Sequence, residues 1–300
     1  TYSSSMGPDV EVSKTGAFLQ GDYQLTERLS LQAGVRRETI RNQVDDSTPY
    51  GEAVTAATVA GYQARTLEGG NVRHSETLFN LGAVYKLTDT QQLFANFSQG
   101  FSLPDTQRML RDVPASFVID SSSIDSIKVN NYELGWRLGD ASGLNAGVTA
   151  FYNTSDKVVQ FNRDFSVSVA DTDERVWGAE GNLQVPVVEG WTLGGTLAYT
   201  RGQYKDAAGN WRELNAFRVS PLKATVYSDW RFLDGYGVRL QALTVGGSDR
   251  AYDDAQSAAI SPTIRATPAT KIQGYTVVDL IAHAPWLGGE VGFGVYNLAN

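Results

Sequence analysis

The sequence predicts an all-β fold, an antiparallel up-and-down β-barrel that spans a membrane. Three observations favour it: apolar and polar residues alternate along most of the chain, short turns alternate with long loops, and aromatic residues gather near predicted strand ends. Because successive strand side chains point to opposite faces of a sheet, each predicted strand has one apolar and one polar face. A membrane strand needs only every second residue to be apolar, so a mean hydropathy of −0.26 is compatible with this fold.

The alternation is clearest in residues 29–36, 132–138, 144–150 and 191–200. No stretch shows the i, i+3, i+4, i+7 spacing of an amphipathic helix, so we expect essentially no helix. The pattern predicts about twelve strands, over residues 11–24, 28–42, 73–86, 92–102, 125–138, 144–161, 170–186, 191–204, 214–230, 236–247, 272–284 and 290–298.

The predicted connections alternate between two kinds. Tight turns rich in Gly and Asp are expected at 25–28, 87–90, 139–143, 188–190, 233–235 and 285–289. Longer loops fall at 43–72, 103–124, 162–169, 205–213 and 248–271. Outer-membrane barrels combine short periplasmic turns with long extracellular loops, so we expect the long loops to face outside.

A soluble β-sandwich or propeller also produces alternating strands. Such folds do not place short turns at one end of the sheet and long loops at the other so regularly. The polar face of the predicted strands also carries charges that suit a water-filled lumen, namely Glu133, Arg137, Arg239 and Asp279. The membrane barrel is therefore the favoured interpretation.

Composition excludes several kinds of chemistry. The 300 residues include no cysteine, two histidines, 25 basic and 33 acidic side chains. Disulfides, thiolate nucleophiles, cysteine-ligated metals and multi-histidine metal sites are therefore excluded. A net charge of −8 argues against a nucleic-acid partner. No Gly-x-Ser-x-Gly elbow is present, and the acidic pairs Asp45–Asp46, Asp253–Asp254 and Asp171 with Asp173 lack calcium-loop spacing. We expect no enzyme activity, no cofactor and no metal site.

Several segments resemble TonB-dependent receptors, in the order found in that family. Phe97-Ser98-Gln99-Gly100-Phe101, with Pro104 nearby, is similar to the family's strand that ends in an aromatic residue, Ser, any residue, Gly and Phe. Further similar segments are 16–20 with 34–36, 131–137 with 150–152 and 156–159, 178–181, and 275–280 with the Val-x-Asn-Leu signature at 295–298. Each motif is weak alone, but together they cover nearly the whole chain.

The resemblance implies the C-terminal part of a larger barrel. Family members have 22 strands around an N-terminal plug, so we expect residues 1–300 to form one partial barrel domain. This domain would correspond to roughly strands ten to twenty-one. We expect no plug, no TonB-contacting segment and no final aromatic strand within this chain. A self-contained barrel of twelve strands is the structural alternative.

The resemblance also implies function. We expect a receptor in the bacterial outer membrane, monomeric, that takes up a ferric siderophore with energy delivered by TonB through the absent N-terminal segment. Outer-membrane lipid and lipopolysaccharide are the expected surroundings. The alternatives are a receptor of this family for another ligand (a vitamin, haem or a glycan), a self-contained outer-membrane pore or lipolytic barrel, and a soluble β-rich adhesin.

Four loop residues are the candidate ligand contacts: Arg108, Arg111, Trp211 and Tyr252. They lie near predicted strand mouths or beside another aromatic or basic residue. Arginine offers a fixed fork of donors to carboxylate or hydroxamate oxygens, and Trp or Tyr offers a rigid flat contact. His74 begins a strand after the first long loop, and His283 is expected to face the lumen in phase with Asp279.

Overall fold

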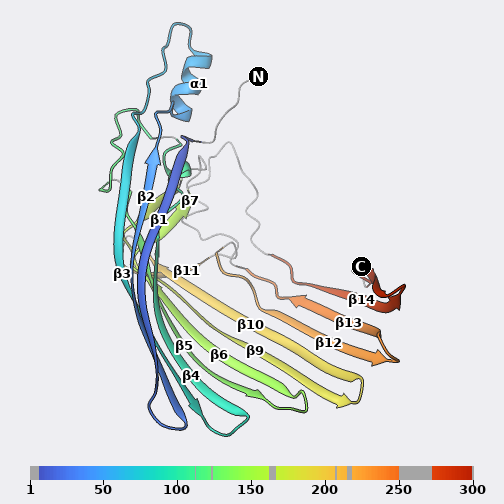
Figure 1. Cartoon of the computed structure of the whole chain (residues 1–300). Helices are drawn as coiled ribbons and strands as arrows, with labels where there is room; N and C mark the ends of the chain where they lie inside the picture. Colours follow the sequence, from blue (N-terminus) through green and yellow to red (C-terminus); the bar gives the residue numbers. More distant parts are fainter. Residues whose placement is uncertain are drawn as a thin grey trace.

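A computed structural model describes residues 7–111, 113–122, 124–161, 167–206, 208–214, 218–249 and 272–298. Its main feature is one antiparallel sheet of 13 strands, which curves into a tall wall (Figure 1). Twelve of the strands follow each other in chain order, each hydrogen-bonded to the next. In the part of the chain that the structure describes, no ladder joins the first strand to the last, so the wall is an open barrel segment.

The twelve predicted strands are confirmed. They are β1 (Val10–Gln24), β2 (Leu29–Val44), β3 (Gly70–Lys86), β4 (Gln91–Ser102), β5 (Ile127–Gly139), β6 (Asn145–Ser155), β9 (Glu174–Val188), β10 (Trp191–Lys205), β12 (Lys223–Phe232), β13 (Tyr236–Val245), β14 (Tyr275–Trp286) and β15 (Gly289–Val295). The largest boundary differences are at β6, which ends at Ser155, and at β12, which begins at Lys223.

The long loops carry structure of their own. The prediction of essentially no helix was wrong there: α1 (Tyr50–Thr58) and α2 (Thr106–Met109) lie in the first and second long loops. Both helices are too short to show a helical repeat in the sequence. The helix α1 contains several alanines, which favour helix formation. Loop strands β7 (Val158–Phe161) and β8 (Val167–Ala170) pair with each other, and β11 (Trp211–Glu213) extends the end of β10. Neither described helix is long and apolar enough to cross a membrane.

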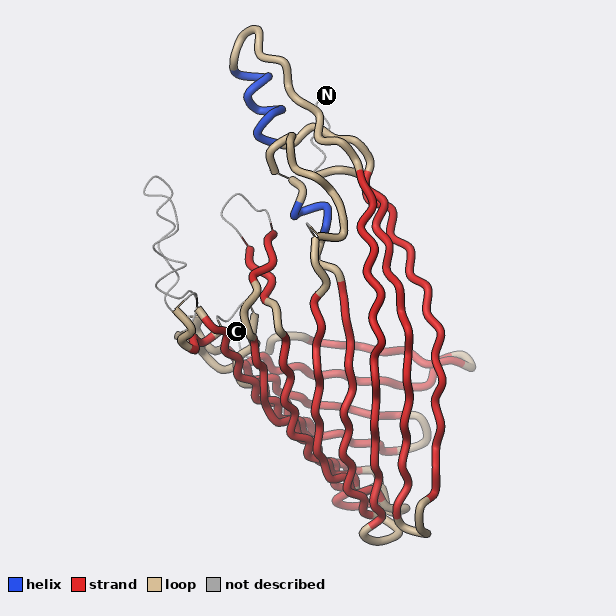
Figure 2. Tube along the Cα trace, turned by 90° about the vertical axis from the view of Figure 1, so that its left-hand side faces the viewer, coloured by secondary structure: helices blue, strands red, loops and turns tan. Residues whose placement is uncertain are grey.

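The long loops and the short turns lie at opposite ends of the wall. Figure 2 shows both helices and the longer loops at one end and the tight turns at the other. This sorting, predicted from loop lengths, is confirmed.

The strand register gives the wall one apolar face. Directly paired residues share a face, and one such row crosses six strands: Ala33, Leu81, Phe97, Tyr132, Tyr152 and Trp177. These side chains are not buried by protein, since Leu81 is 55% and Tyr132 46% exposed. We call this side of the sheet the outer face.

The opposite, inner face is polar. The four charges predicted to line a lumen all lie on it, and each faces a polar cross-strand partner: Glu133 with Asn96, Arg137 with Gln92, Arg239 with Asp229, and Asp279 with Gln241. The Arg239 guanidinium lies 2.6 Å from a carboxylate oxygen of Asp229. His283 pairs with Gly237 on the same face, as predicted.

Glycine is required where strands and rings approach closely. A Cβ atom on Gly178 would lie 2.1 Å from the carbonyl oxygen of Tyr199 and 2.7 Å from Cζ of Phe151, its cross-strand partner. Any larger residue at Gly178 would therefore displace the backbone of β10.

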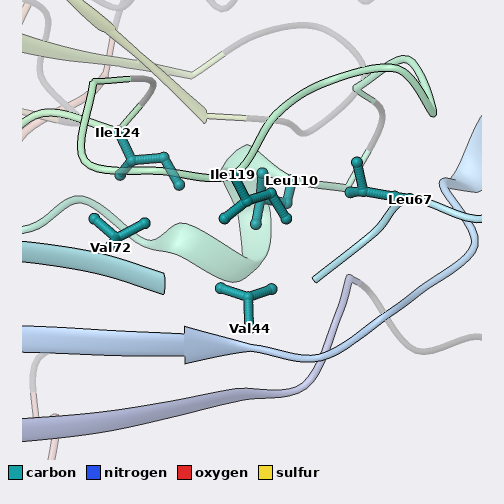
Figure 3. Close-up of a cluster of buried hydrophobic side chains, with 6 residues drawn as sticks. All are labelled: Val44, Leu67, Val72, Leu110, Ile119 and Ile124. Atoms are coloured by element: carbon teal, nitrogen blue, oxygen red, sulfur yellow. The ribbon is translucent and has the colours of Figure 1, made fainter. Parts of the chain in front are cut away.

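The best-buried apolar cluster lies at the long-loop end of the wall, between strand ends and loops. Val44, Leu67, Val72, Leu110, Ile119 and Ile124 form it, and all are at most 6% exposed (Figure 3). The cluster joins the ends of β2 and β3 to loops 45–69 and 103–126, which together we call the loop cap.

Candidate ligand-binding mouth

The loop cap covers the inner side of the wall at its long-loop end. Asn42 and Val72 are a buried cross-strand pair on the inner face of β2 and β3. The amide nitrogen of Asn42 donates to the hydroxyl of buried Thr106 at 2.7 Å, which places α2 against this face. Leu110, which follows α2, is 1% exposed within the cluster. The second long loop therefore stands over the mouth of the trough that the inner face lines.

The two loops of the cap are joined at Tyr50 and Arg111. The backbone N–H of Tyr50 donates to the carbonyl of Arg111 at 2.8 Å. The Arg111 guanidinium lies 4.7 Å from the centroid of the Tyr50 ring, in cation–π contact. Tyr50 remains 47% exposed, so its ring presents a surface to solvent beside the half-buried Arg111.

A carboxylate holds the tip of the first loop. Glu52 accepts from the hydroxyl of Tyr62 at 2.6 Å and from the side chain of Arg65 at 2.5 and 3.0 Å. These hydrogen bonds, those of Arg65 first, lower the pKa of Glu52 to about 2. They also raise the pKa of Tyr62 and of Arg65. The cluster is therefore an ionised clamp that fixes residues 50–65 as one unit.

A lysine ties the second loop to the third. The Lys157 ammonium lies 2.5 Å from Asp171 and 2.9 Å from Asp125, and these two carboxylates raise the pKa of Lys157. The same contact lowers the pKa of Asp125. His74 Nε2 lies 2.7 Å from the carbonyl oxygen of Ile124, so this histidine holds the loop to β3.

Two of the four predicted ligand contacts lie together at the mouth. Arg108, at the end of α2, is 51% exposed, and its Nε is 3.4 Å from Asp105. Arg111 follows three residues later and contacts Tyr50. Tyr50 was not among the four candidates, because nothing in the sequence indicates which loop residue meets which.

Trp211, the third candidate, does not join this mouth. Trp211 pairs with Lys205, which shares the outer face of β10 with Tyr199. The guanidinium of Arg175 stacks on the Trp211 ring at 3.9 Å, on the same outer side. The two-residue alternation of β10, continued as far as Lys205, places Lys205 on the outer face. The sequence could therefore have indicated the outer position of Trp211. Tyr252 lies outside the described residues.

Three members of the acidic pairs make local contacts. Asp46 accepts from the backbone N–H of Gly69 at 2.7 Å, Asp171 contacts Lys157, and Asp173 lies 2.6 Å from Lys205. Asp253 and Asp254 lie outside the described residues. Within the described ranges, no group of three or more His, Cys, Asp or Glu side chains is placed to hold a metal ion.

Comparison with known proteins agrees with a barrel wall. The family model described as "TonB dependent receptor-like, beta-barrel" matches residues 1–298. The chain belongs to this family. Because these barrels are outer-membrane proteins, the chain is an outer-membrane barrel segment with the loop cap outside and the tight turns in the periplasm.

Curated relatives of this barrel segment are named as receptors. The ferric aerobactin receptor of Klebsiella pneumoniae is 30% identical over 312 residues, which cover 99% of this chain and 40% of that protein. The rhizobactin receptor of Rhizobium meliloti (strain 1021) is 33% identical over 235 residues, covering 74% of this chain and 31% of the relative. The chain thus spans about two fifths or less of the length of these relatives.

Solved structures show the same fold. The copper transporter OprC superposes with a TM-score of 0.73 at 16% identity, over 97% of this chain and 43% of OprC. The ferric-catecholate import receptor Fiu of E. coli K12, in its closed form, gives 0.72 at 18% identity, over 96% of this chain and 40% of Fiu. At these identities the likeness concerns the TonB-dependent receptor fold alone.

Proposed function

We propose that this barrel segment serves the energy-coupled uptake of a ferric siderophore across the outer membrane. The observation that carries the proposal is the 30% identity to a ferric aerobactin receptor over 99% of the chain, loops included. TonB is the proposed energy source, since the chain belongs to the family named for it. The proposed role is binding and transport, not catalysis.

The mouth offers chemistry suited to an anionic iron chelate. Arg108 and Arg111 supply two guanidinium groups within four residues, and Tyr50 supplies a flat, half-exposed ring beside Arg111. Guanidinium forks match carboxylate and hydroxamate oxygens, and charge-assisted hydrogen bonds are about twice as strong as neutral ones. The polar contacts of a binding site are few, so these three residues are the proposed anchor for one side of the ligand.

The inner face below the mouth suits passage of a hydrated, polar ligand. Its described cross-strand pairs include amide and ion-pair contacts, such as Arg137 with Gln92 and Arg239 with Asp229. A shallow hollow on this face is lined by Asp22, Gln32 and Asn96, among others, toward the tight-turn end. These polar side chains form the wall of the proposed transport path.

Uptake of radiolabelled iron tests the proposal. The protein is expressed in cells that lack their own ferric-siderophore receptors and is supplied with ⁵⁵Fe-aerobactin. We expect accumulation that stops when TonB is deleted or the proton gradient is collapsed. A ferric catecholate at the same concentration controls for the class of chelate. Equal accumulation with and without the protein, or accumulation independent of TonB, would exclude the proposal.

A further inference from the structure

Helix α1 turns an apolar side toward solvent. Its residues Tyr50, Ala53, Val54 and Ala57 are all exposed, Tyr50 by 47% and Val54 by 42%. Because they lie three and four residues apart, they share one side of the helix. We call these four residues the α1 stripe. Single exposed apolar side chains are ordinary on a protein surface, but four that line one side of a helix indicate a contact site.

The opposite side of α1 is already occupied. Glu52, Thr55 and Ala56 lie on that side, and none of them is exposed. The carboxylate of Glu52, 9% exposed, accepts hydrogen bonds from Tyr62 and Arg65 of the returning chain. Rotating the helix to bury the α1 stripe would break these hydrogen bonds. The ionised clamp therefore holds the stripe outward.

The stripe begins at the proposed ligand anchor. The ring of Tyr50, its first member, lies 4.7 Å from the guanidinium of Arg111, and the N–H of Tyr50 donates to the carbonyl of Arg111. From Tyr50 to Ala57 the stripe is about 10 Å long, at 1.5 Å per residue. Figure 1 shows that α1 projects beyond the ends of the strands. A cationic group thus lies at one end of an apolar surface that continues along the helix.

Size and charge together indicate what covers the stripe. Each partner in a stable protein complex buries about 800 Å², and four side chains on two helical turns offer a small part of that area. A linear hydrocarbon chain of about eight carbons matches the length of the stripe. The guanidinium of Arg111 favours an anion at the Tyr50 end. The expected occupant is therefore amphiphilic, with an anionic head and one apolar chain.

We propose that the α1 stripe binds an apolar chain carried by the anionic iron chelate, so that the substrates of this mouth are amphiphilic chelates. The inference rests on the proposed function and names its substrate class. Arg111 holds oxygen atoms of the head, and Val54 with the two alanines contacts the chain. A fully buried methylene strengthens binding roughly fourfold. A chain lying on an open stripe buries about half of its surface, which gives about twofold per carbon.

Competition between two ferric chelates tests the proposal. Both are citrate–hydroxamate chelates with the same head and charge, and they differ in one N-acyl group, acetyl in one and octanoyl in the other. Each displaces the ⁵⁵Fe-labelled acetyl chelate from intact cells on ice. Cells without the protein correct for chelate that dissolves in membranes. We expect the octanoyl chelate to act at a concentration at least about tenfold lower, from its six additional carbons.

The outcomes separate this inference from the proposed function. Equal displacement by the two chelates would overturn the inference and leave siderophore uptake standing. Absence of saturable binding by either chelate would overturn the proposed function, and the inference with it.

Three variants place the preference on the α1 stripe. Val54→Gln retains helix propensity and should reduce the octanoyl preference about fourfold, because about two carbons lose their apolar contact. Ala57→Leu enlarges the stripe and should increase the preference. The matched control is Val59→Gln, a residue 51% exposed just beyond α1 and outside the stripe, which should keep the preference unchanged.

The preference is a ratio of two affinities for the same mouth, so a cap that folds poorly weakens both chelates and does not imitate the expected change. The same octanoyl preference in Val54→Gln and Val59→Gln would overturn the proposal. A Val54→Gln variant that altered the oligomeric state while keeping the preference would also overturn it, since the stripe would then bind a second copy of the chain.

Discussion

Replacing Leu110 by Ala should loosen the loop cap without weakening the barrel wall. Leu110 is 1% exposed in the apolar cluster and lies next to Arg111 at the mouth. Truncation of a buried leucine costs about 2–5 kcal/mol, through lost burial and the cavity left behind. Because the strands are held by their own ladders, this cost falls on local opening of the cap.

Hydrogen–deuterium exchange measures that opening. A loss of about 2 kcal/mol corresponds to roughly 30-fold faster exchange. The informative amides are the N–H of Tyr50, which bonds across the cap to Arg111, and the N–H of Ile124, which bonds to Asp120 within the second loop. Amides in the β9–β10 ladder should keep their rates.

The matched control is Val118→Ala in the same loop. Val118 is 67% exposed, so its truncation should leave the exchange of Tyr50 and Ile124 unchanged. If Leu110→Ala exchanged at these amides no faster than Val118→Ala does, the cap would not depend on the buried cluster and the reasoning would be refuted.

Three further predictions concern the clamp, the wall and the mouth. Glu52 has its pKa lowered from 4.5 to about 2, so the stability it adds is present above about pH 4.5 and is lost as pH falls toward 2. Pepsin should therefore cleave loop 45–69 slowly at pH 4 and quickly near pH 2, and Glu52→Gln, which cannot ionise to hold Arg65, should be cleaved quickly at both. Gly178→Ala should lower the unfolding free energy by about 1–3 kcal/mol in urea titrations, because its Cβ would meet backbone 2.1 Å away. Gly100→Ala, whose Cβ would have nothing within 4 Å, should change little, and equal effects of the two would contradict the strand register. Arg111→Gln should raise the KM of ferric aerobactin uptake about tenfold, the worth of one charge-assisted hydrogen bond, with the maximal rate unchanged; an unchanged KM would remove Arg111 from the site.

Much of the wall could be predicted from sequence, because a half-buried strand repeats every two residues. Each of the twelve strands, the side on which Glu133 and Asp279 lie, and the sorting of turns by length follow from that period. The family resemblance covered the same residues and is confirmed by the family match over 1–298.

The mouth could be predicted only in part, because loops have no period. Arg108 and Arg111 were chosen as arginines near a strand mouth, but Tyr50 lies about 60 residues away from Arg111 in the chain and meets it only through the cap. Trp211 was chosen for the same kind of reason, yet pairing with Lys205 places it on the outer face. The short helix α1 contains three alanines, and the alternating hydrophobic pattern does not reveal it.

A cysteine scan along β5 tests most directly the central claim that one face of this wall meets lipid and the other lines the transport path. The chain has no native cysteine, so single nitroxide labels can be placed at successive positions. We predict that a label at Leu134 is relaxed by oxygen, which concentrates in lipid, and that a label at Glu133 is relaxed by a water-soluble nickel chelate. The preference should alternate from 130 to 138. A label at Leu134 that met the nickel chelate as readily as one at Glu133 would contradict the account.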